Sequence, residues 1–412
     1  MSFVKTTSTT RSTWTRALYW MGAAALACGL TACGGGGGGG SGGEGTLRVA
    51  LTDAPSCGFD HVWVTVEKVR VHQSSSASDA DAGWSDLTLA TPRRLDLLDL
   101  TNGVLEELGS MPLAAGQYSQ VRLVLADNTG AGSAAIANAV QPTGGAVTAL
   151  ATPSAQQSGL KLQAHFEVAA GQLSDLVLDF DACKSVVKAG NSGKFILKPV
   201  VSVVPRAVTA IQGFISTSLA PNSTTVAAQQ NGTTIRSTAP DATGKFSIPF
   251  LSTGTYTVVV LSEGHATAVV TGVPAGTGTT VINGTATAIT SPVSSMADVT
   301  GTVSVSSVSG STTVSSALTE ATAQATQALA GGPVIEVGRQ SVDSVLGTYR
   351  FHLPVGAPVK AAFAAGAALT FAPDATAAGK YSIQVQSPGR AMQTKPADIT
   401  GGNATVNFSY GP

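Results

Sequence analysis

Three aspartates are the strongest metal-ligand candidates in this sequence: Asp53, Asp179 and Asp181. Asp179 and Asp181 lie two positions apart in an apolar, strand-like run, so their carboxylates would point to the same side. Oxygen ligands of this kind suit calcium. Aspartates also cap turns at strand ends, and the sequence has no loop with regularly spaced acidic ligands. We therefore expect no metal site and treat these three residues as the calcium candidates.

Histidines could serve as bases or metal ligands, but in this chain they are scattered, one to each expected strand or turn: His61, His72, His165, His265 and His352. The sequence also lacks the metalloprotease, serine hydrolase and phosphate-loop motifs. We therefore expect no enzymatic activity and no cofactor. The alternative is a hydrolase of envelope or extracellular polymers, with a site near Asp53, Asp179 and Asp181, because a triad built from distant residues leaves no local signature.

The amino terminus has the pattern of an export signal. Basic residues occur within the first 16 positions, an uncharged and mostly apolar run covers residues 17–30, and the first acidic residue is Glu44. A basic segment followed by a short apolar one is typical of a signal peptide, and it is too short to cross a bilayer comfortably. Residues 1–32 are therefore predicted to be a signal peptide.

Cys33 is the residue with the most specific predicted chemistry. It follows Leu30-Thr31-Ala32, and these four residues resemble the lipobox of bacterial lipoproteins. The resemblance implies that the Cys33 thiol receives a diacylglycerol before cleavage exposes its amine, and that acyl chains then hold the protein on a membrane. In the lipoproteins that this segment resembles, a residue other than aspartate after the cysteine implies transport to the outer membrane, and Gly34 is such a residue. The alternative is ordinary secretion, with Cys33 incidental.

A glycine-rich segment follows this cysteine. Residues 34–43 are all glycine apart from Ser41. Glycine has no side chain to bury and loses the most entropy on ordering, so residues 33–44 are predicted to form a flexible tether. The tether would let the folded part stand away from the membrane.

Cys57 and Cys183 are the cysteines of the part of the chain that is predicted to fold. They flank the first strand and a late strand of one expected domain, and export places them in an oxidising compartment, so we expect a disulfide between them. The long loop that it closes would stabilise the fold by at most about 5 kcal/mol on a chain-entropy estimate. Two buried free thiols are the alternative.

The elements that must hold these residues are expected to be strands. Aromatic residues make up 5% of the chain and charged residues 11%, and the formal net charge is -1. Abundant Gly, Ser, Thr and Val favour short strands and turns, and the near-neutral charge argues against nucleic-acid binding. A chain of 412 residues suits two to four domains. The predicted fold class is all-β, with three tandem β-sandwich domains behind the signal peptide and the polyglycine tether.

Residues 45–206 are expected to form the first sandwich, because period-two and apolar segments of strand length recur through them. Residues 95–100 are predicted as a strand and 104–108 as a short helix. Several segments, in the same order, resemble a family of bacterial lipoprotein domains known only as a domain of unknown function (family four-three-eight-two), which implies architecture and location but no activity. The segments are 51–55, 64–69, 95–98, 116–123, 178–182 and 197–199.

Two later segments, 207–292 and 293–412, repeat one another. The matching positions are Gly213 with Gly301, Gly244 with Gly347, Gly254 with Gly379, and residues 280–283 with 405–408. Each segment resembles the carboxypeptidase-regulatory-like, transthyretin-type β-sandwich, in which such glycines turn the chain and aromatics plug the core. The resemblance implies accessory modules. The alignment also predicts a strand within 320–330, although the composition there favours helix.

These features together predict a lipoprotein of the cell envelope, on the outer membrane, with a non-catalytic binding or structural role. The expected partners are the membrane, through the N-terminal lipid, and a glycan or an envelope protein at the loops of the sandwiches. No nucleic-acid partner is expected. The role rests on analogy between folds.

Overall fold

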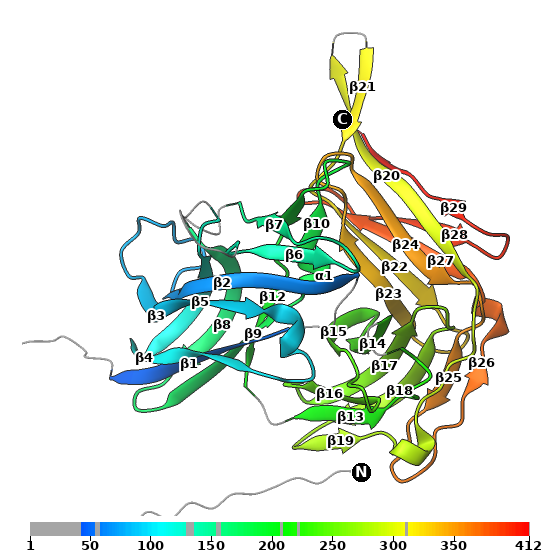
Figure 1. The fold of residues 1–412 in the computed structure, drawn as a ribbon, viewed down its shortest axis with the longest axis horizontal. Helices are drawn as coiled ribbons and strands as arrows, with labels where there is room; N and C mark the ends of the chain where they lie inside the picture. Colours follow the sequence, from blue (N-terminus) through cyan, green and yellow to red (C-terminus); the bar gives the residue numbers. More distant parts are fainter. Residues whose placement is uncertain are drawn as a thin grey trace, which may run out of the picture. The chain divides into compact units, whose positions relative to one another are not determined.

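The structure, a computed structural model, describes residues 43–53, 58–128, 136–153, 158–206, 209–220, 223–309 and 312–411 (Figure 1). All of these belong to one unit, Gly42–Pro412. The chain is 58% strand and 4% helix, which confirms the all-β fold class. In the described part, no helix is long and apolar enough to cross a membrane. Cys33, its tether as far as Gly42, and Cys57 lie outside the described residues, so the predictions for them stay predictions.

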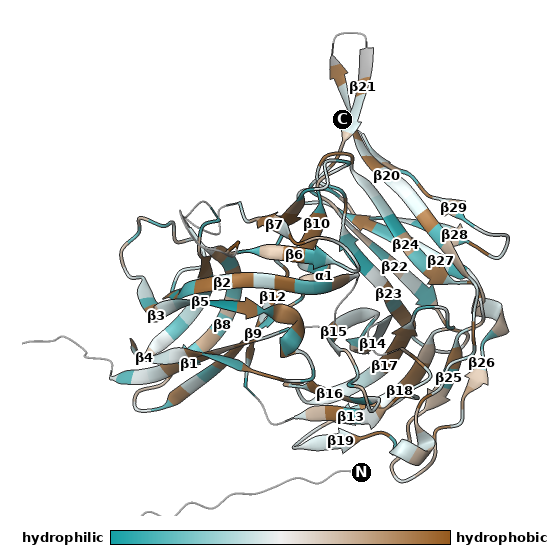
Figure 2. Cartoon of the chain, viewed as in Figure 1, coloured by the Kyte–Doolittle hydropathy of each residue, from teal (hydrophilic) through white to brown (hydrophobic). Residues whose placement is uncertain are grey.

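The first sandwich consists of two sheets, one ordered β12-β9-β1-β4 and the other β10-β11-β7-β6-β2-β5-β8, with β3 also paired to β2. Apolar and polar residues alternate along β2 (Figure 2), and its inward valines join a core that includes Leu123 and Phe180. The strands are β1 (Glu44–Asp53), β2 (Phe59–His72), β3 (Ser85–Asp96), β4 (Glu106–Ala114), β5 (Gly116–Leu125), β6 (Ala139–Pro142), β7 (Thr148–Ala151), β8 (Leu160–Val168), β9 (Leu173–Phe180), β10 (Val186–Lys188), β11 (Phe195–Leu197) and β12 (Val201–Pro205).

Two local predictions for this sandwich are wrong. Residues 97–100 continue from β3 as a 3-10 helix, η1 (Leu97–Leu100), because the Asp96 side chain accepts a hydrogen bond from the Leu98 N–H and caps the turn. Residues 104–108 contain no helix and lead into β4, whose Glu107 pairs with Ala50 of β1. Sheet pairing outweighs helix propensity at this position.

The second sandwich has a sheet ordered β16-β13-β19 and a larger one ordered β15-β14-β17-β18-β25-β26. The last two strands, β25 and β26, come from the third repeat, where they lie in the long connection over residues 355–379. β25 runs parallel to β18, with Val359 beside Ala268. Val359 is buried in the core of the second sandwich. The strands are β13 (Ala210–Phe214), β14 (Thr224–Gln230), β15 (Thr233–Thr238), β16 (Lys245–Pro249), β17 (Gly254–Ser262), β18 (Ala268–Ala275), β19 (Thr279–Val281), β25 (Val359–Ala362) and β26 (Ala372–Pro373).

The third sandwich pairs a sheet ordered β23-β22-β27-β28 with one ordered β21-β20-β24, in which β29 and β30 also pair with β20. β22 confirms the strand predicted within 320–330. Short 3-10 helices η3 (Thr285–Thr287) and η4 (Ala375–Ala377) lie in connections of the two repeats. The strands are β20 (Met296–Ser309), β21 (Thr312–Ala317), β22 (Thr322–Ala328), β23 (Val334–Ser341), β24 (Thr348–Pro354), β27 (Lys380–Gln386), β28 (Gln393–Asp398), β29 (Ala404–Thr405) and β30 (Phe408–Tyr410).

The second and third sandwiches share buried surface. In β17, Val258 and Val260 face the core of the second sandwich, whereas Val259 between them belongs to the core of the third. Val269 of β18 likewise packs into the third core. Because successive side chains of a strand point to opposite faces, this sheet is buried on both sides. The two repeats are therefore packed layers with a common central sheet.

The repeated glycines occupy equivalent places. Gly213 pairs with Phe246 across β13 and β16, and Gly301 pairs with Tyr349 across β20 and β24. A Cβ at either glycine would come within 3 Å of the partner ring. The last matching segments, 280–283 and 405–408, also correspond, but one residue away from the predicted alignment. Asn283 accepts a hydrogen bond from the Phe214 N–H in the second sandwich, and its counterpart in the third is Asn407, which accepts from the Thr302 N–H.

Candidate functional site

The three predicted calcium ligands lie at one end of β1 and β9. Asp53 ends β1, and its Oδ1 accepts a hydrogen bond from the Ala182 N–H at 2.9 Å. Asp181 caps the short helix α1 (Ala182–Ser185) by accepting from the Lys184 N–H at 3.0 Å. Both contacts are of the capping kind. Among the described residues, no group of three or more His, Cys, Asp or Glu side chains could hold a metal ion.

Asp179 makes a different contact. Its Oδ1 lies 3.1 Å from Nη2 of Arg236, which is on β15 of the second sandwich. Burial raises the pKa of Asp179 to about 6, and the Arg236 charge opposes the rise. Burial also lowers the pKa of Arg236, whose guanidinium lies over the Phe250 ring, 5.4 Å from its centroid. This pair joins the first sandwich to the second.

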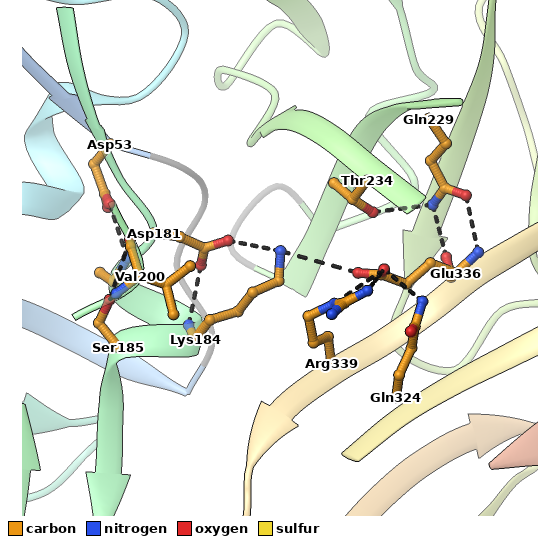
Figure 3. Close-up of polar contacts among 11 residues, drawn as sticks. Asp53, Asp181, Lys184, Ser185, Val200, Gln229, Thr234, Gln324, Glu336 and Arg339 are labelled. Atoms are coloured by element: carbon orange, nitrogen blue, oxygen red, sulfur yellow. Dashed lines mark hydrogen bonds and ion pairs between the residues drawn. The ribbon is translucent and has the colours of Figure 1, made fainter. Parts of the chain in front are cut away.

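A second polar cluster joins α1 to the third sandwich (Figure 3). Lys184 Nζ lies 2.8 Å from Asp181 Oδ2 and 4.0 Å from Oε1 of Glu336 on β23. The other carboxylate oxygen of Glu336 accepts from Arg339 at 2.9 Å and from Gln324 at 2.8 Å. In this cluster, Lys184 pairs with Asp181 and Glu336, and Glu336 also pairs with Arg339, so opposite charges connect α1 to β23.

Gln229 of β14 extends the cluster into the second sandwich (Figure 3). Its Nε2 donates to the Glu336 carbonyl at 2.7 Å, and its Oε1 accepts from the Glu336 N–H at 2.9 Å. The Gln229 side chain is almost completely buried. Two hydrogen bonds from one amide to one backbone residue hold β14 against β23, so a single polar cluster contacts all three sandwiches.

A cavity of about 850 Å³ lies where the three sandwiches meet. The first sandwich contributes Asp60 of β2 and Asp99 of η1. The second contributes Glu263, His265 and Thr267, from the turn between β17 and β18 and its edges. Residues of the third sandwich and of the turns complete the wall; among them are His352, Met296, Leu353, Pro354 and Val337. The wall therefore combines carboxylates, imidazoles and hydroxyls with apolar patches.

Two of the scattered histidines line this wall, and each contacts Glu263. His352 Nδ1 lies 2.7 Å from Asp298 Oδ1, and its Nε2 lies 3.2 Å from Glu263 Oε1. His265 Nδ1 lies 3.0 Å from the Glu263 carbonyl oxygen. Hydrogen bonds from Arg350 and His352 lower the pKa of Asp298. No spacing in the sequence indicated that these two histidines would line one cavity, because they lie in different repeats.

We looked in the cavity wall for a histidine hydrogen-bonded to a serine or threonine hydroxyl, the pair that activates a nucleophile. Within the described ranges, neither His265 nor His352 hydrogen-bonds a serine or threonine hydroxyl. Such a bond is the geometric signature of nucleophilic catalysis by serine or threonine.

Thr267 has a buried hydroxyl in the cavity wall. The residue is 1% exposed, and its Oγ1 has no hydrogen-bond partner among the residues that the structure describes. Leaving a buried polar group unsatisfied costs about 1–3 kcal/mol.

Both tryptophans of the described part carry positively charged or imidazole neighbours on their rings. The His61 ring stacks on Trp63 with centroids 4.7 Å apart, and the Arg94 guanidinium lies 4.3 Å from the Trp63 ring. Trp84 has Arg70 and Arg122 at 4.7 and 4.5 Å. These contacts are cation–π in geometry. Neither tryptophan is a bare aromatic platform for a sugar ring.

Cys183 lies in α1, next to this junction. It is disulfide-bonded in the structure. Its predicted partner, Cys57, falls outside the described residues, so the pairing of the two stays a prediction.

The first sandwich matches a known family. Residues 44–199 match the family described as "Domain of unknown function (DUF4382)". The match confirms the resemblance found in this part of the sequence, and the family's description assigns no activity. No curated protein matches the chain.

Two solved structures show distant similarity over part of the chain. Both are mutant type II cohesin–X-dockerin complexes from Acetivibrio cellulolyticus, at 22% and 26% identity and TM-scores of 0.18 and 0.16. Each match covers 21% of this chain and 58% or 55% of the other chain, so the chain spans little more than half the length of these structures. A likeness at this level carries no argument about function.

Proposed function

We propose that this protein is a non-catalytic binding protein of the cell envelope, and that its ligand occupies the cavity between the three sandwiches. The observation that carries the proposal is the cavity of about 850 Å³, whose wall combines polar and apolar side chains. Ligand pockets of folded proteins have this size and this mixed lining, and they occur preferentially where domains meet.

The polar clusters beside the cavity support this role. The Asp179–Arg236 pair and the Lys184–Glu336 contact connect the sandwiches that form the wall. Walls held by such contacts keep their spacing before a ligand arrives, which reduces the ordering cost of binding. The cluster therefore acts as a frame for the site.

We propose that the protein binds its ligand without catalysing a reaction. The hydrolase alternative depended on convergence of Asp53, Asp179 and Asp181 in a cleft. Each of them instead contacts a backbone N–H or a basic side chain. No observation therefore favours hydrolysis over binding.

The location is proposed from the sequence. Cys33 would be lipidated, and its acyl chains would hold the tethered sandwiches at the outer membrane. Changing Cys33→Ser should move the protein from the membrane fraction to the soluble fraction and abolish labelling by a radioactive fatty acid. Unchanged fractionation and labelling would contradict the anchor.

The binding role can be tested by filling the cavity. Ala239 lies in the wall, and Ala239→Trp should reduce the volume available to a ligand. Ala364→Trp, at an exposed position of the third repeat, is the matched control. The detergent-solubilised full chain would be screened against glycans and small polar metabolites by thermal shift. Ligands that stabilise the parent and Ala364→Trp but not Ala239→Trp support the proposal; equal stabilisation of all three would contradict it.

A further inference from the structure

The sequence contains three Asn–Gly pairs: Asn102–Gly103, Asn231–Gly232 and Asn283–Gly284. In such a pair the backbone nitrogen of the glycine can attack the side-chain carbonyl of the asparagine, because glycine has no Cβ to obstruct the approach. The attack needs an amide side chain that can rotate and a glycine N–H that no acceptor holds. The three pairs differ in both respects.

Asn231 and Gly232 form the tip of the hairpin between β14 and β15 (Figure 1), where Gln230 pairs with Thr233. Both have left-handed backbone angles, with φ of 50° and 74°, as is typical of the central residues of a two-residue hairpin turn. Asn231 is exposed, and its side chain makes no hydrogen bond in the described part of the chain. The Gly232 N–H has no acceptor among the same residues. The two groups that must react are therefore not held by hydrogen bonds there.

The Asn283 side chain, in contrast, is held at three points. Its Oδ1 accepts from the Phe214 N–H at 2.7 Å, and its Nδ2 donates to the carbonyls of Phe214 at 2.8 Å and Thr287 at 2.9 Å. The Gly284 N–H donates to the Thr287 hydroxyl at 3.1 Å. Cyclisation of this pair would first have to break these bonds, which raises its barrier.

Asn102 is held where the first sandwich contacts the second. Its Oδ1 accepts from the Thr238 hydroxyl at 3.0 Å and from the Ser247 N–H at 3.2 Å. Gly103 lies against Pro249, because a Cβ on Gly103 would come within 2.8 Å of the Pro249 Cγ. Contacts with β15 and β16 therefore fix this pair.

We propose that Asn231 is a site of spontaneous covalent modification. The Gly232 nitrogen loses its proton and bonds to the Asn231 Cγ, the Cγ–Nδ2 bond breaks, and ammonia leaves with that proton, so that a succinimide ring remains. Water then opens the ring at one of its two carbonyls. Opening at Cγ gives aspartate, and opening at the backbone carbonyl gives isoaspartate, whose main chain runs through Cβ and Cγ. Both residues line a surface cavity of about 610 Å³, so water reaches them. The reaction needs no ligand and is independent of the proposed binding function.

The modification changes a contact between the second and third sandwiches. The Gly232 carbonyl accepts from Nε2 of Gln324 on β22 at 3.3 Å. Gln229, two residues before Asn231, bonds the backbone of Glu336 (Figure 3). Isoaspartate adds one atom to the main chain of the turn, and either product adds a negative charge at its tip. Because turn type and loop length set the register of a hairpin, isoaspartate should displace Gly232 and Gln229 from their partners in the third sandwich.

The reaction is tested by incubating the detergent-solubilised full chain at mildly alkaline pH. Peptide mass spectrometry would follow all three pairs, and an isoaspartate methyltransferase assay would detect isoaspartate. Asn231 should be modified at least about tenfold faster than Asn102 or Asn283, the ratio that a barrier difference of about 1.4 kcal/mol produces. In guanidinium chloride the three rates should become similar, because the pairs are chemically alike. Equal rates in the folded chain, or the same ratio in the denaturant, would overturn the proposal.

Thr287→Val tests whether hydrogen bonds set these rates. It removes the acceptor of the Gly284 N–H and should speed the modification of Asn283 by about threefold or more, through a lower barrier. The rate at Asn231 should stay the same. An unchanged rate at Asn283 would refute hydrogen bonding as the cause of the difference.

Hydrogen exchange measures the consequence at the contact between the sandwiches. After incubation, the amides of β14 and β23 around Gln229 and Glu336 should exchange faster than before. The matched control is Asn231→Gly, which lacks the reactive amide and suits the positive φ; it should exchange at the same rate before and after incubation. An equal change in both proteins, or a modified parent with unchanged exchange, would contradict the link between Asn231 and this contact.

Discussion

Nη2 of Arg236 lies 3.1 Å from Oδ1 of Asp179, and both side chains are enclosed where β15 of the second sandwich meets β9 of the first. Their side chains are 6% and 12% exposed, respectively. Moving two charges out of water is costly, and their mutual attraction offsets this cost only while both partners are present. The pair therefore makes the contact between the sandwiches depend on two residues that are distant in sequence.

Breaking this pair should destabilise the protein, and replacing it should not. Arg236→Met alone leaves Asp179 buried without its cation, which is expected to cost about 3–5 kcal/mol. The double change Arg236→Met with Asp179→Leu should recover most of that loss, as measured by denaturant unfolding. Arg93→Met at the partly exposed Arg93–Glu106 pair is the control and should cost less than about 1 kcal/mol. A double variant no more stable than the single one would contradict this account.

Stability should depend on the protonation of Asp179. Because burial raises its folded pKa from the ordinary value near 4 to about 6, folding takes up a proton between these pH values. The stabilising effect of the protonated carboxyl is complete below about pH 4 and is lost as the pH rises to about 6. The loss amounts to about 2–3 kcal/mol.

The measurement compares the parent with Asp179→Asn across pH 4 to 7. Asp298, whose pKa is lowered by Arg350 and His352, contributes stability that is lost as the pH falls, so the parent curve alone mixes opposite slopes. The difference between the two curves isolates Asp179 and should fall toward pH 6 and then level off. A flat difference would show that its pKa is not raised.

Gly301 should tolerate no side chain. A Cβ there would lie 1.9 Å from the Val406 carbonyl oxygen and 2.7 Å from the Tyr349 ring, at the crossing of β20 with β24 and the tail. Gly301→Ala should therefore lower stability by about 1–3 kcal/mol or more. Gly401→Ala, where a Cβ meets nothing within 4 Å, is the control. Equal melting temperatures for both variants would refute the close approach.

Peptide mapping without reductant tests the predicted pairing of the cysteines. A linked peptide pair containing Cys57 and Cys183 is expected, and Cys183→Ala should lower stability by about 2–5 kcal/mol. Two thiols that react with an alkylating reagent after mild unfolding, before any reduction, would contradict the bond. The variant Cys57→Ala should match Cys183→Ala if the two residues share one disulfide.

Several features were predictable from the sequence because they depend on local pattern. Period-two alternation predicts β2, and the abundance of Gly, Ser, Thr and Val predicts an all-β chain. The internal repeat placed Gly213 and Gly301 at equivalent positions and predicted β22 where composition favoured a helix. Alternation and turn glycines are set by neighbouring residues, so one sequence is enough to find them.

The candidate site was decided by tertiary structure. His265 and His352 line one cavity because the two repeats share the sheet that contains β17, and neither residue has a spacing that indicates this. Asp179 and Arg236 likewise carry no local sign of their pairing. β25 belongs by sequence to the later repeat but joins β18 of the earlier one, because the edge of β18 has backbone groups that pair with it. Contacts between distant residues follow from packing and sheet registration, which local sequence periodicity does not specify.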